Sequence, residues 1–190
     1  CLSDWEGAEE PWQFLAACDE YYHCCITKDK ETTGLPVATD ATCSGLQILA
    51  LLAKDEKTAR LVNVLPSERP QDAYKVVAGV AKWNCPRHIQ EVMDRKVVKR
   101  TVMTIPYNAK PYSNRSYIKD ALAEKGIEID KDDLTITVQA VRDAMHAVVP
   151  GPMNVMKWIE DEVSRAIKRG ATELEWVTPS GFVVNQRIMK

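Results

Sequence analysis

The stretch that most constrains the fold is residues 94–107, which read Asp-Arg-Lys-Val-Val-Lys-Arg-Thr-Val-Met-Thr-Ile-Pro-Tyr. It lacks the alternation of polar and apolar residues that is typical of a half-buried strand. Wound as a helix at about 100° per residue, it gathers one set of side chains within an arc of roughly 140°. That set is Arg95, Lys96, Lys99, Arg100, Met103 and Tyr107. We therefore predict a helix with one basic face and one face that can pack.

Two interpretations of this helix are open. A run of charges is usually a solvated helix face. A basic face that ends in an aromatic ring is also suited to a polyanion that carries a flat ring, such as a nucleotide. Pro106 should end or kink the helix near Thr104, because the residue before a proline avoids the α region. We therefore expect Tyr107 to leave its ideal helical position.

The composition favours a local binding site over a uniformly charged surface. The chain has 190 residues, is 45% hydrophobic and carries a formal net charge of −2, so it can bury one good core or contribute to two. Its basic charge is concentrated in one region, at Lys82, Arg87, Arg95, Lys96, Lys99 and Arg100. A basic patch in a nearly neutral protein suits a binding site better than general affinity for nucleic acid.

The cysteines and the hydropathy exclude other classes. The six cysteines include no C-x-x-C pair, so we expect buried free thiols in a reducing compartment and no metal site at His23 and its neighbours. No apolar run approaches the ~20 residues of a membrane span, and no signal peptide is visible.

Periodicity predicts a mainly α fold with short β segments, an α+β chain. The predicted helices cover residues 11–25, 45–53, 70–83, 94–104, 117–124, 134–148 and 153–169, with a turn-rich loop at 106–116. A short buried strand is expected at 35–39 and a hairpin at 173–184 around the turn Thr178-Pro-Ser-Gly181. The helix at 153–169 is expected to bury Met156, Ile159, Val163 and Ile167.

Local signals refine three of these helices. Pro11 suits the first turn of the helix 11–25. In the helix 70–83, Asp72 suits the positive N-terminal end, and one face carries Tyr74, Val77, Ala78 and Ala81. The acidic cluster at 130–133 lacks the spacing of a calcium loop, so we expect it to cap the helix 134–148.

Asp40 stands between the predicted strand and a helix, 45–53, that is apolar almost all round and should be interior. Thr42 or Ser44 is expected to cap that helix. A carboxylate at such a place is costly unless a cation or hydrogen-bond donors compensate it. Asp40 is therefore a candidate metal ligand, and the alternative is a second capping residue.

Two motifs belong together. The aspartate motif, residues 36–47, reads Pro-x-x-x-Asp-Ala-Thr-Cys-Ser-Gly-Leu-Gln, and the basic motif, residues 95–107, begins Arg-x-x-x-Lys and ends at Tyr107. Together they resemble the two signatures of the bacteriophage-type, single-subunit DNA-dependent RNA polymerases, which also serve mitochondria and chloroplasts. The segments 10–17, 63–67 and 176–182 agree, so the resemblance runs nearly end to end.

The resemblance implies a palm–fingers fragment of a right-hand polymerase. Residues 1–56 would be part of the palm with the first catalytic motif, and residues 57–190 part of the fingers, including the nucleotide-binding helix 94–107. We expect an internal fragment, because the chain opens on Cys1 without an initiator Met.

The resemblance also implies the chemistry: nucleotidyl transfer from ribonucleoside triphosphates on a DNA template, by a two-metal mechanism. Asp40 and the backbone carbonyl of Ala41 would hold Mg²⁺, a hard cation that prefers oxygen ligands and is shared with substrate phosphates. Arg95 and Lys99 would contact the triphosphate, and Lys99 would also serve catalysis by protonating pyrophosphate.

Tyr107 would stack near the active-site base pair and help to select ribose, while Tyr112 and Arg100 would contact nucleic acid. The implied partners are a DNA template with its promoter, the RNA product and ribonucleoside triphosphates, with no membrane and a monomeric enzyme.

Departures from the family pattern carry information. Ile48 stands where a histidine is common, and Asn108 stands where the family has glycine, although asparagine also tolerates a left-handed turn. The Pro106-Tyr-Asn variant favours a phage branch, and hence the cytoplasm of an infected bacterium, with a mitochondrion or chloroplast as the alternative.

No His-Asp-Ser segment occurs, so the second metal-binding aspartate of the family is missing and the fragment is expected to be inactive alone. Three other readings are open: a DNA polymerase of the related palm–fingers superfamily, a non-enzymatic helical module that binds nucleic acid through residues 82–117, and a purely structural helical domain.

Overall fold

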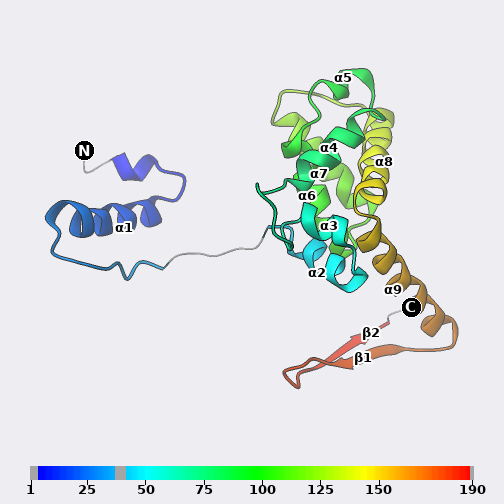
Figure 1. The fold of residues 1–190 in the computed structure, drawn as a ribbon. Coiled ribbons are helices and arrows are strands. Elements are labelled where there is room, and N and C mark those ends of the chain that lie inside the picture. Colours follow the sequence, from blue (N-terminus) through cyan, green and yellow to red (C-terminus); the bar gives the residue numbers. More distant parts are fainter. Residues whose placement is uncertain (1–3, 37–41, 189–190) are drawn as a thin grey trace. The chain divides into compact units, whose positions relative to one another are not determined.

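The structure is a computed structural model that describes residues 4–36 and 42–188. Its internal contacts divide the chain into two compact units, Cys1–Ala41 and Thr42–Lys190. Each unit is described by itself (Figure 1).

The first unit is a small helical segment. It contains the 3₁₀ helix η1 (Asp4–Gly7), the helix α1 (Pro11–Tyr21) and the π-helix η2 (Tyr22–Thr27). Pro11 lies in the first turn of α1, as predicted, where its missing N–H costs nothing. None of residues 4–36 is fully buried, so the described part of this unit has no core of its own.

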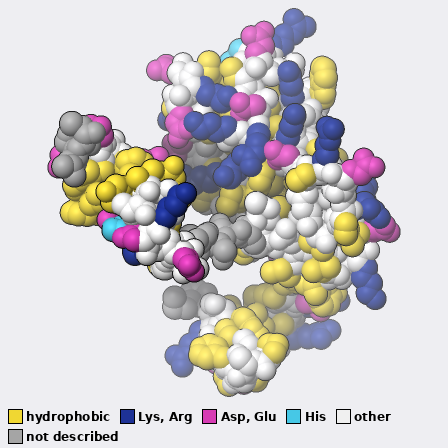
Figure 2. All heavy atoms as spheres, turned by 60° about the vertical axis from the view of Figure 1, so that its left-hand side comes forward, with side chains coloured by type: hydrophobic (Ala, Val, Ile, Leu, Met, Phe, Trp, Pro, Cys, Tyr) yellow, Lys and Arg dark blue, Asp and Glu magenta, His cyan; other side chains and the backbone are white. Residues whose placement is uncertain are grey.

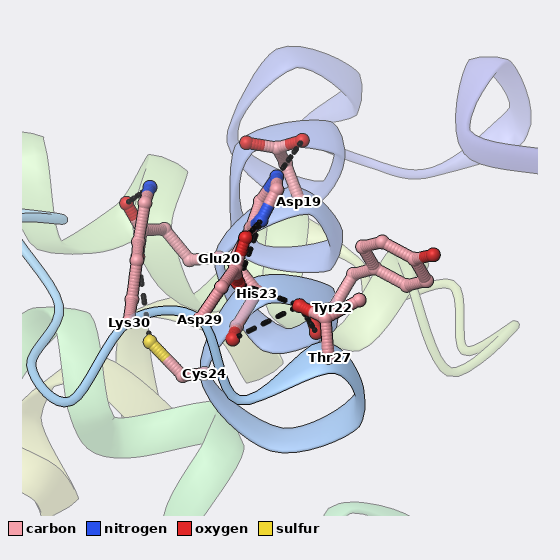
Figure 3. Close-up of polar contacts among 8 residues, drawn as sticks. All are labelled: Asp19, Glu20, Tyr22, His23, Cys24, Thr27, Asp29 and Lys30. Carbon is pink, nitrogen blue, oxygen red and sulfur yellow. Dashed lines mark hydrogen bonds and ion pairs between the residues drawn. The ribbon is translucent and has the colours of Figure 1, made fainter.

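A polar network holds the end of the π-helix to the segment that follows it (Figure 3). His23 Nδ1 lies 3.0 Å from the Asp29 carboxylate, and the Thr27 hydroxyl donates to Asp29 Oδ1 at 2.6 Å. Lys30 Nζ donates to Glu20 Oε1 at 3.2 Å. The network gives His23 a structural role in this unit.

The second unit is helical with one hairpin, which confirms the predicted fold class (Figure 1). Its elements are α2 (Ser44–Ala53), α3 (Glu56–Leu61), α4 (Ala73–Lys82), α5 (Arg87–Gln90), α6 (Arg95–Thr104), η3 (Ile105–Tyr107), α7 (Pro111–Ala123), α8 (Lys131–Val148), α9 (Pro150–Lys168), β1 (Glu173–Val177) and β2 (Val183–Arg187). The helix α4 packs on α8 and α6, α6 packs on α7, and α2 packs on α9.

The core of this unit lies between α4, α6, α7 and α8. The predicted packing face of α6 is buried, with Val97, Val98 and Val102 at 0% exposure. The predicted face of α4 is buried as well, through Tyr74, Val77, Ala78 and Ala81. Burial of these faces leaves the basic face of α6 exposed.

Aspartates begin four of the helices. The side chains of Asp55, Asp72, Asp94 and Asp130 accept hydrogen bonds from backbone N–H groups in the first turns of α3, α4, α6 and α8. Such caps satisfy donors that have no partner inside the helix. The capping role predicted for the acidic cluster at 130–133 is confirmed.

The helices α4, α7, α8 and α9 begin at Ala73, Pro111, Lys131 and Pro150, so their starts differ from the prediction. The loop predicted at 106–116 is wrong after Lys110, because Pro111 occupies the first turn of α7, where proline is favoured. The helix α4 begins at Ala73, after its Asp72 cap, rather than at Pro70.

The helix α2 is only half interior. Leu46 and Leu49 are buried, whereas Ile48, Leu51 and Leu52 are 58%, 59% and 65% exposed. The predicted caps Thr42 and Ser44 are wrong: the N-cap is Cys43, in a left-handed conformation with φ 47°, and no side chain caps the helix.

The burial predicted for 153–169 is also wrong in part. Ile159 and Ile167 are 43% and 42% exposed, and Met156 and Val163 are only partly buried. The buried residues of α9 are Pro152 and Met153, near its start, because the rest of the helix runs out toward the hairpin (Figure 1).

The cysteine prediction is confirmed in one respect only. The five cysteines within the described residues are free thiols, but Cys18 and Cys25 are exposed and only Cys85 is buried.

The strand predicted at 35–39 does not include Leu35 or Pro36, and its remaining residues lie outside the described part of the chain.

The hairpin is confirmed. β1 and β2 pair antiparallel with Trp176 opposite Val184, and the Gly181 N–H donates to the Thr178 carbonyl at 2.8 Å to close the turn. Trp176 and Phe182 are 52% and 69% exposed. Within the described ranges, no helix is long and apolar enough to cross a membrane.

Two leucines test where the core lies. Leu122 is 0% exposed, whereas Leu52 is 65% exposed. Leu122→Ala should lower the free energy of unfolding by about 2–5 kcal/mol, because it leaves a cavity, and Leu52→Ala should lower it by less than about 0.5 kcal/mol. Urea unfolding of both variants measures this, and equal losses would contradict the packing described.

Candidate active site

Asp94 fixes the start of the basic helix. Its Oδ1 accepts from the backbone N–H groups of Lys96 and Val97 at 3.0 and 3.2 Å, and its Oδ2 accepts from Lys125 Nζ at 2.6 Å. Partial burial raises the pKa of Asp94, but the bonds from Lys125 and the backbone outweigh it, so the pKa lies below its ordinary value. The carboxylate is therefore charged at neutral pH, and α6 begins at a defined residue.

The cations of α6 have different partners. Arg95 Nε donates to Asp72 Oδ2 at 2.8 Å. Lys96 Nζ lies 3.0 Å from Glu124 Oε2. The guanidinium of Arg100 lies over the ring of Tyr117, 4.3 Å from its centroid.

Lys99 differs from its neighbours on the helix. Within the described residues, its side chain makes no hydrogen bond, ion pair or ring contact, and it is exposed. Figure 2 shows Lys and Arg side chains interspersed with acidic ones over the upper part of the second unit. Lys99 is therefore available for an anionic ligand without the loss of a contact to any residue that the structure describes.

Pro106 and Asn108 determine where Tyr107 lies. The helix α6 ends at Thr104, as predicted, and continues as the 3₁₀ turn η3. Asn108 adopts the left-handed conformation, with φ 66°, which asparagine tolerates. Tyr107 is 69% exposed, so its ring is open to a ligand.

Tyr107 meets the aspartate motif. Its hydroxyl lies 3.1 Å from Ser44 Oγ, a contact between residues 63 positions apart in the chain. A Cβ on Gly45 would lie 2.8 Å from Pro106 Cβ and 3.3 Å from the Tyr107 ring. Because only a glycine permits this approach, Gly45 is the residue that lets the two motifs touch.

The other end of α6 and the aspartate motif line the same cavity, which has a volume of about 540 Å³. Its lining includes Thr42, Cys43, Asp72, Tyr74 and Arg95. Burial raises the pKa of the Cys43 thiol, and burial together with Cys43 raises the pKa of Tyr74 to about 12. Both groups are therefore neutral at neutral pH, and Arg95 and Asp72 supply the charge at this cavity.

The remaining predicted site residues are not brought into this contact by any observed interaction. Asp40 and Ala41 lie outside the described residues, so their role as metal ligands stays a prediction. Over residues 4–36 and 42–188, no group of three or more His, Cys, Asp or Glu side chains could hold a metal ion. Tyr112 lies in the first turn of α7 and is 87% exposed.

Sequence reasoning missed three residues that shape the site: Ser44, Gly45 and Asp72. Ser44 and Gly45 were visible within the aspartate motif, but nothing local indicated that Tyr107 would contact them. For Asp72 the sequence indicates only a favourable place at the positive N-terminal end of α4, because its partner Arg95 is 23 residues away.

The two ends of the basic helix α6 thus lie against the aspartate motif, Tyr107 at Ser44 and Gly45 and Arg95 at the cavity lined by Thr42 and Cys43. A family model described as DNA-dependent RNA polymerase matches residues 2–190. The chain is 34% identical to the mitochondrial DNA-directed RNA polymerase of Homo sapiens, over 96% of this chain and 16% of that protein. It is 30% identical to the chloroplastic/mitochondrial DNA-directed RNA polymerase 2B of Nicotiana tabacum, over 98% and 20%.

The DNA-directed RNA polymerase of Enterobacteria phage T3 is 27% identical over 98% of this chain and 27% of that protein. The chain belongs to the phage-type DNA-dependent RNA polymerase family. It spans between about a sixth and a quarter of the length of these relatives.

Two glycines test the contact between the motifs. Gly45→Ala should lower the free energy of unfolding by about 1–3 kcal/mol, because the new Cβ must push Pro106 and Tyr107 away. Gly79→Ala, in α4, meets nothing within 4 Å and should raise the free energy of unfolding by about 0.5–1 kcal/mol. Chemical denaturation measures both, and stabilisation by Gly45→Ala would show that η3 does not press on α2.

Proposed function

We propose that this chain is the part of a DNA-directed RNA polymerase that binds the incoming ribonucleoside triphosphate. The observation that carries the proposal is the convergence of the two motifs: Tyr107 contacts Ser44 and Gly45, while Arg95 shares a cavity with Thr42 and Cys43. Triphosphate and base would then be held from opposite ends of α6. Residues 1–56 are proposed as palm and residues 57–190 as fingers.

Lys99 and Arg95 are the proposed phosphate contacts. Lys99 has no competing partner within the described residues, so its ammonium group can pair with a phosphate without breaking another ion pair. Arg95 presents a planar fork that matches phosphate oxygens. The two cations would neutralise charge that develops on the departing pyrophosphate, and Lys99 would donate a proton to it.

Tyr107 is the proposed contact for the base and the ribose. Its exposed ring offers a stacking surface, and Ser44 orients its hydroxyl. A hydroxyl held in this way can distinguish a ribose 2′-OH from a 2′-hydrogen. Tyr112 and Arg100 are proposed to contact nucleic acid.

Asp40 and the carbonyl of Ala41 would hold Mg²⁺. Carboxylate and carbonyl oxygens are the hard ligands that this ion prefers, so the donor set fits. When bound, two such ions activate the attacking hydroxyl and stabilise the leaving oxygen. The printed sequence contains no His-Asp-Ser segment to supply the family's second aspartate, so we propose that these residues alone do not catalyse.

The proposed partners are a DNA template with its promoter, an RNA product and ribonucleoside triphosphates, handled by a monomeric enzyme. We propose the cytoplasm of a phage-infected bacterium as the location, on the Pro106-Tyr-Asn sequence. A mitochondrion or chloroplast is the alternative, since the human mitochondrial relative is more similar, at 34% identity, than the T3 relative, at 27%.

Two lysines on one helix test the proposal. Lys99→Ala should weaken binding of Mg-ATP to the chain by about 10- to 150-fold, because it removes a charged hydrogen bond worth about 1.5–3 kcal/mol. Lys96→Ala should change it by less than about twofold, because Lys96 is already paired with Glu124. Isothermal titration calorimetry measures both. Equal losses would indicate a diffuse basic surface rather than a nucleotide site.

A further inference from the structure

Asp72 uses its two oxygens for two different purposes. Its Oδ1 accepts from the backbone N–H of Lys75 at 3.1 Å and thereby caps α4. Its Oδ2 accepts from Arg95 Nε at 2.8 Å. One carboxylate therefore links the start of α4 to the first residue of α6.

Asp72 is itself held in place. Asn63 Nδ2 donates to the Gln71 carbonyl at 2.9 Å, and the Gln71 N–H donates to Asn63 Oδ1 at 2.7 Å. This reciprocal pair fixes the backbone just before Asp72. The segment 63–67, which carries part of the family resemblance, thus supports Asp72 through its first residue.

Arg95 is held by a second contact. Its guanidinium lies over the ring of Tyr74, 5.1 Å from the centroid, and Tyr74 is only 5% exposed. Within the described residues, the bond to Asp72 is made through Nε alone, and the two terminal nitrogens make no hydrogen bond. The end of the guanidinium fork is therefore available to a ligand in the cavity that Arg95 lines.

We propose that Asp72 is a positioning residue for the phosphate contact: it holds Arg95 by Nε, over Tyr74, so that the terminal nitrogens face the triphosphate. This rests on the proposed function, in which Arg95 binds that group. Free arginine side chains lose considerable rotamer freedom when they bind. A side chain already ordered by Asp72 and Tyr74 loses less, and affinity rises accordingly.

A role for Asp72 as a competitor of the triphosphate predicts the opposite change in affinity. If Asp72 competed with the triphosphate for Arg95, removal of its charge would strengthen binding. The geometry favours positioning, because the ion pair occupies one nitrogen of Arg95 and leaves the fork free.

Asp72→Asn separates the two functions of the carboxylate. An amide has one acceptor oxygen, so the variant can still cap α4, as asparagine does well, but it cannot also accept from Arg95. Asp130→Asn is the matched control, because Asp130 caps α8 through Oδ1 and makes no ion pair within the described residues.

The probe is sodium tripolyphosphate, titrated into the 190-residue chain and followed by NMR, with the Arg95 Nε–H resonance as a second readout. Asp72→Asn should weaken binding about three- to fivefold, a modest factor because the ion pair is partly exposed. It should also shift the Arg95 Nε–H resonance and speed its exchange with water before any ligand is added. Asp130→Asn should do neither.

A double-mutant cycle decides whether Asp72 acts through Arg95. In an Arg95→Ala background, Asp72→Asn should no longer weaken binding. Unchanged or tighter binding by Asp72→Asn alone would overturn the positioning role while leaving the nucleotide site intact, provided that Arg95→Ala and Lys99→Ala still weaken binding. If neither of those two variants weakens binding, the proposed function fails and the positioning role fails with it.

Discussion

The approach of η3 to the first turn of α2 is the contact on which the proposed site depends. Pro106 ends α6 and turns the chain, Asn108 takes the left-handed conformation that completes the turn, and Gly45 leaves the space into which Pro106 and Tyr107 fit. Any side chain at position 45 would collide with this turn. Residues separated by 63 positions in the chain are thereby brought into contact.

The cations of α6 differ in the partners that neighbouring helices provide. Glu124 neutralises Lys96, and the ring of Tyr117 covers Arg100. Asp72 pairs with Arg95 at the cavity, and Lys99 retains an unpaired charge within the described residues. A stretch whose sequence shows a uniform basic stripe is therefore divided into cations that stabilise the fold and cations available for a ligand.

Sequence alone predicted what depends on local periodicity. The packing faces of α4 and α6, the end of α6 at Thr104, the capping at Asp130 and the hairpin turn at Thr178 all follow from spacing and from the intrinsic preferences of proline, aspartate and glycine. The family could be predicted for the same reason, since its motifs are contiguous.

What depends on tertiary neighbours could not be predicted. The apolar helix α2 suggests burial on every side, yet only one of its faces finds a partner among the described residues, and Leu52 stays exposed. Asp72 resembles an ordinary helix cap until Arg95 is placed beside it. Pro111 favours the start of a helix, but the segment 106–116 also contains residues typical of turns. The local sequence does not decide between a helix and a loop there.

We propose that the aspartate motif and the basic motif form one nucleotide site. Titration of the ¹⁵N-labelled chain with Mg-ATP, followed by amide chemical shifts, tests whether they do. Saturable shifts, with one dissociation constant, are expected at residues 42–45 and at 95–108 together. Shifts confined to the basic motif, or spread over the surface without saturation, would contradict it.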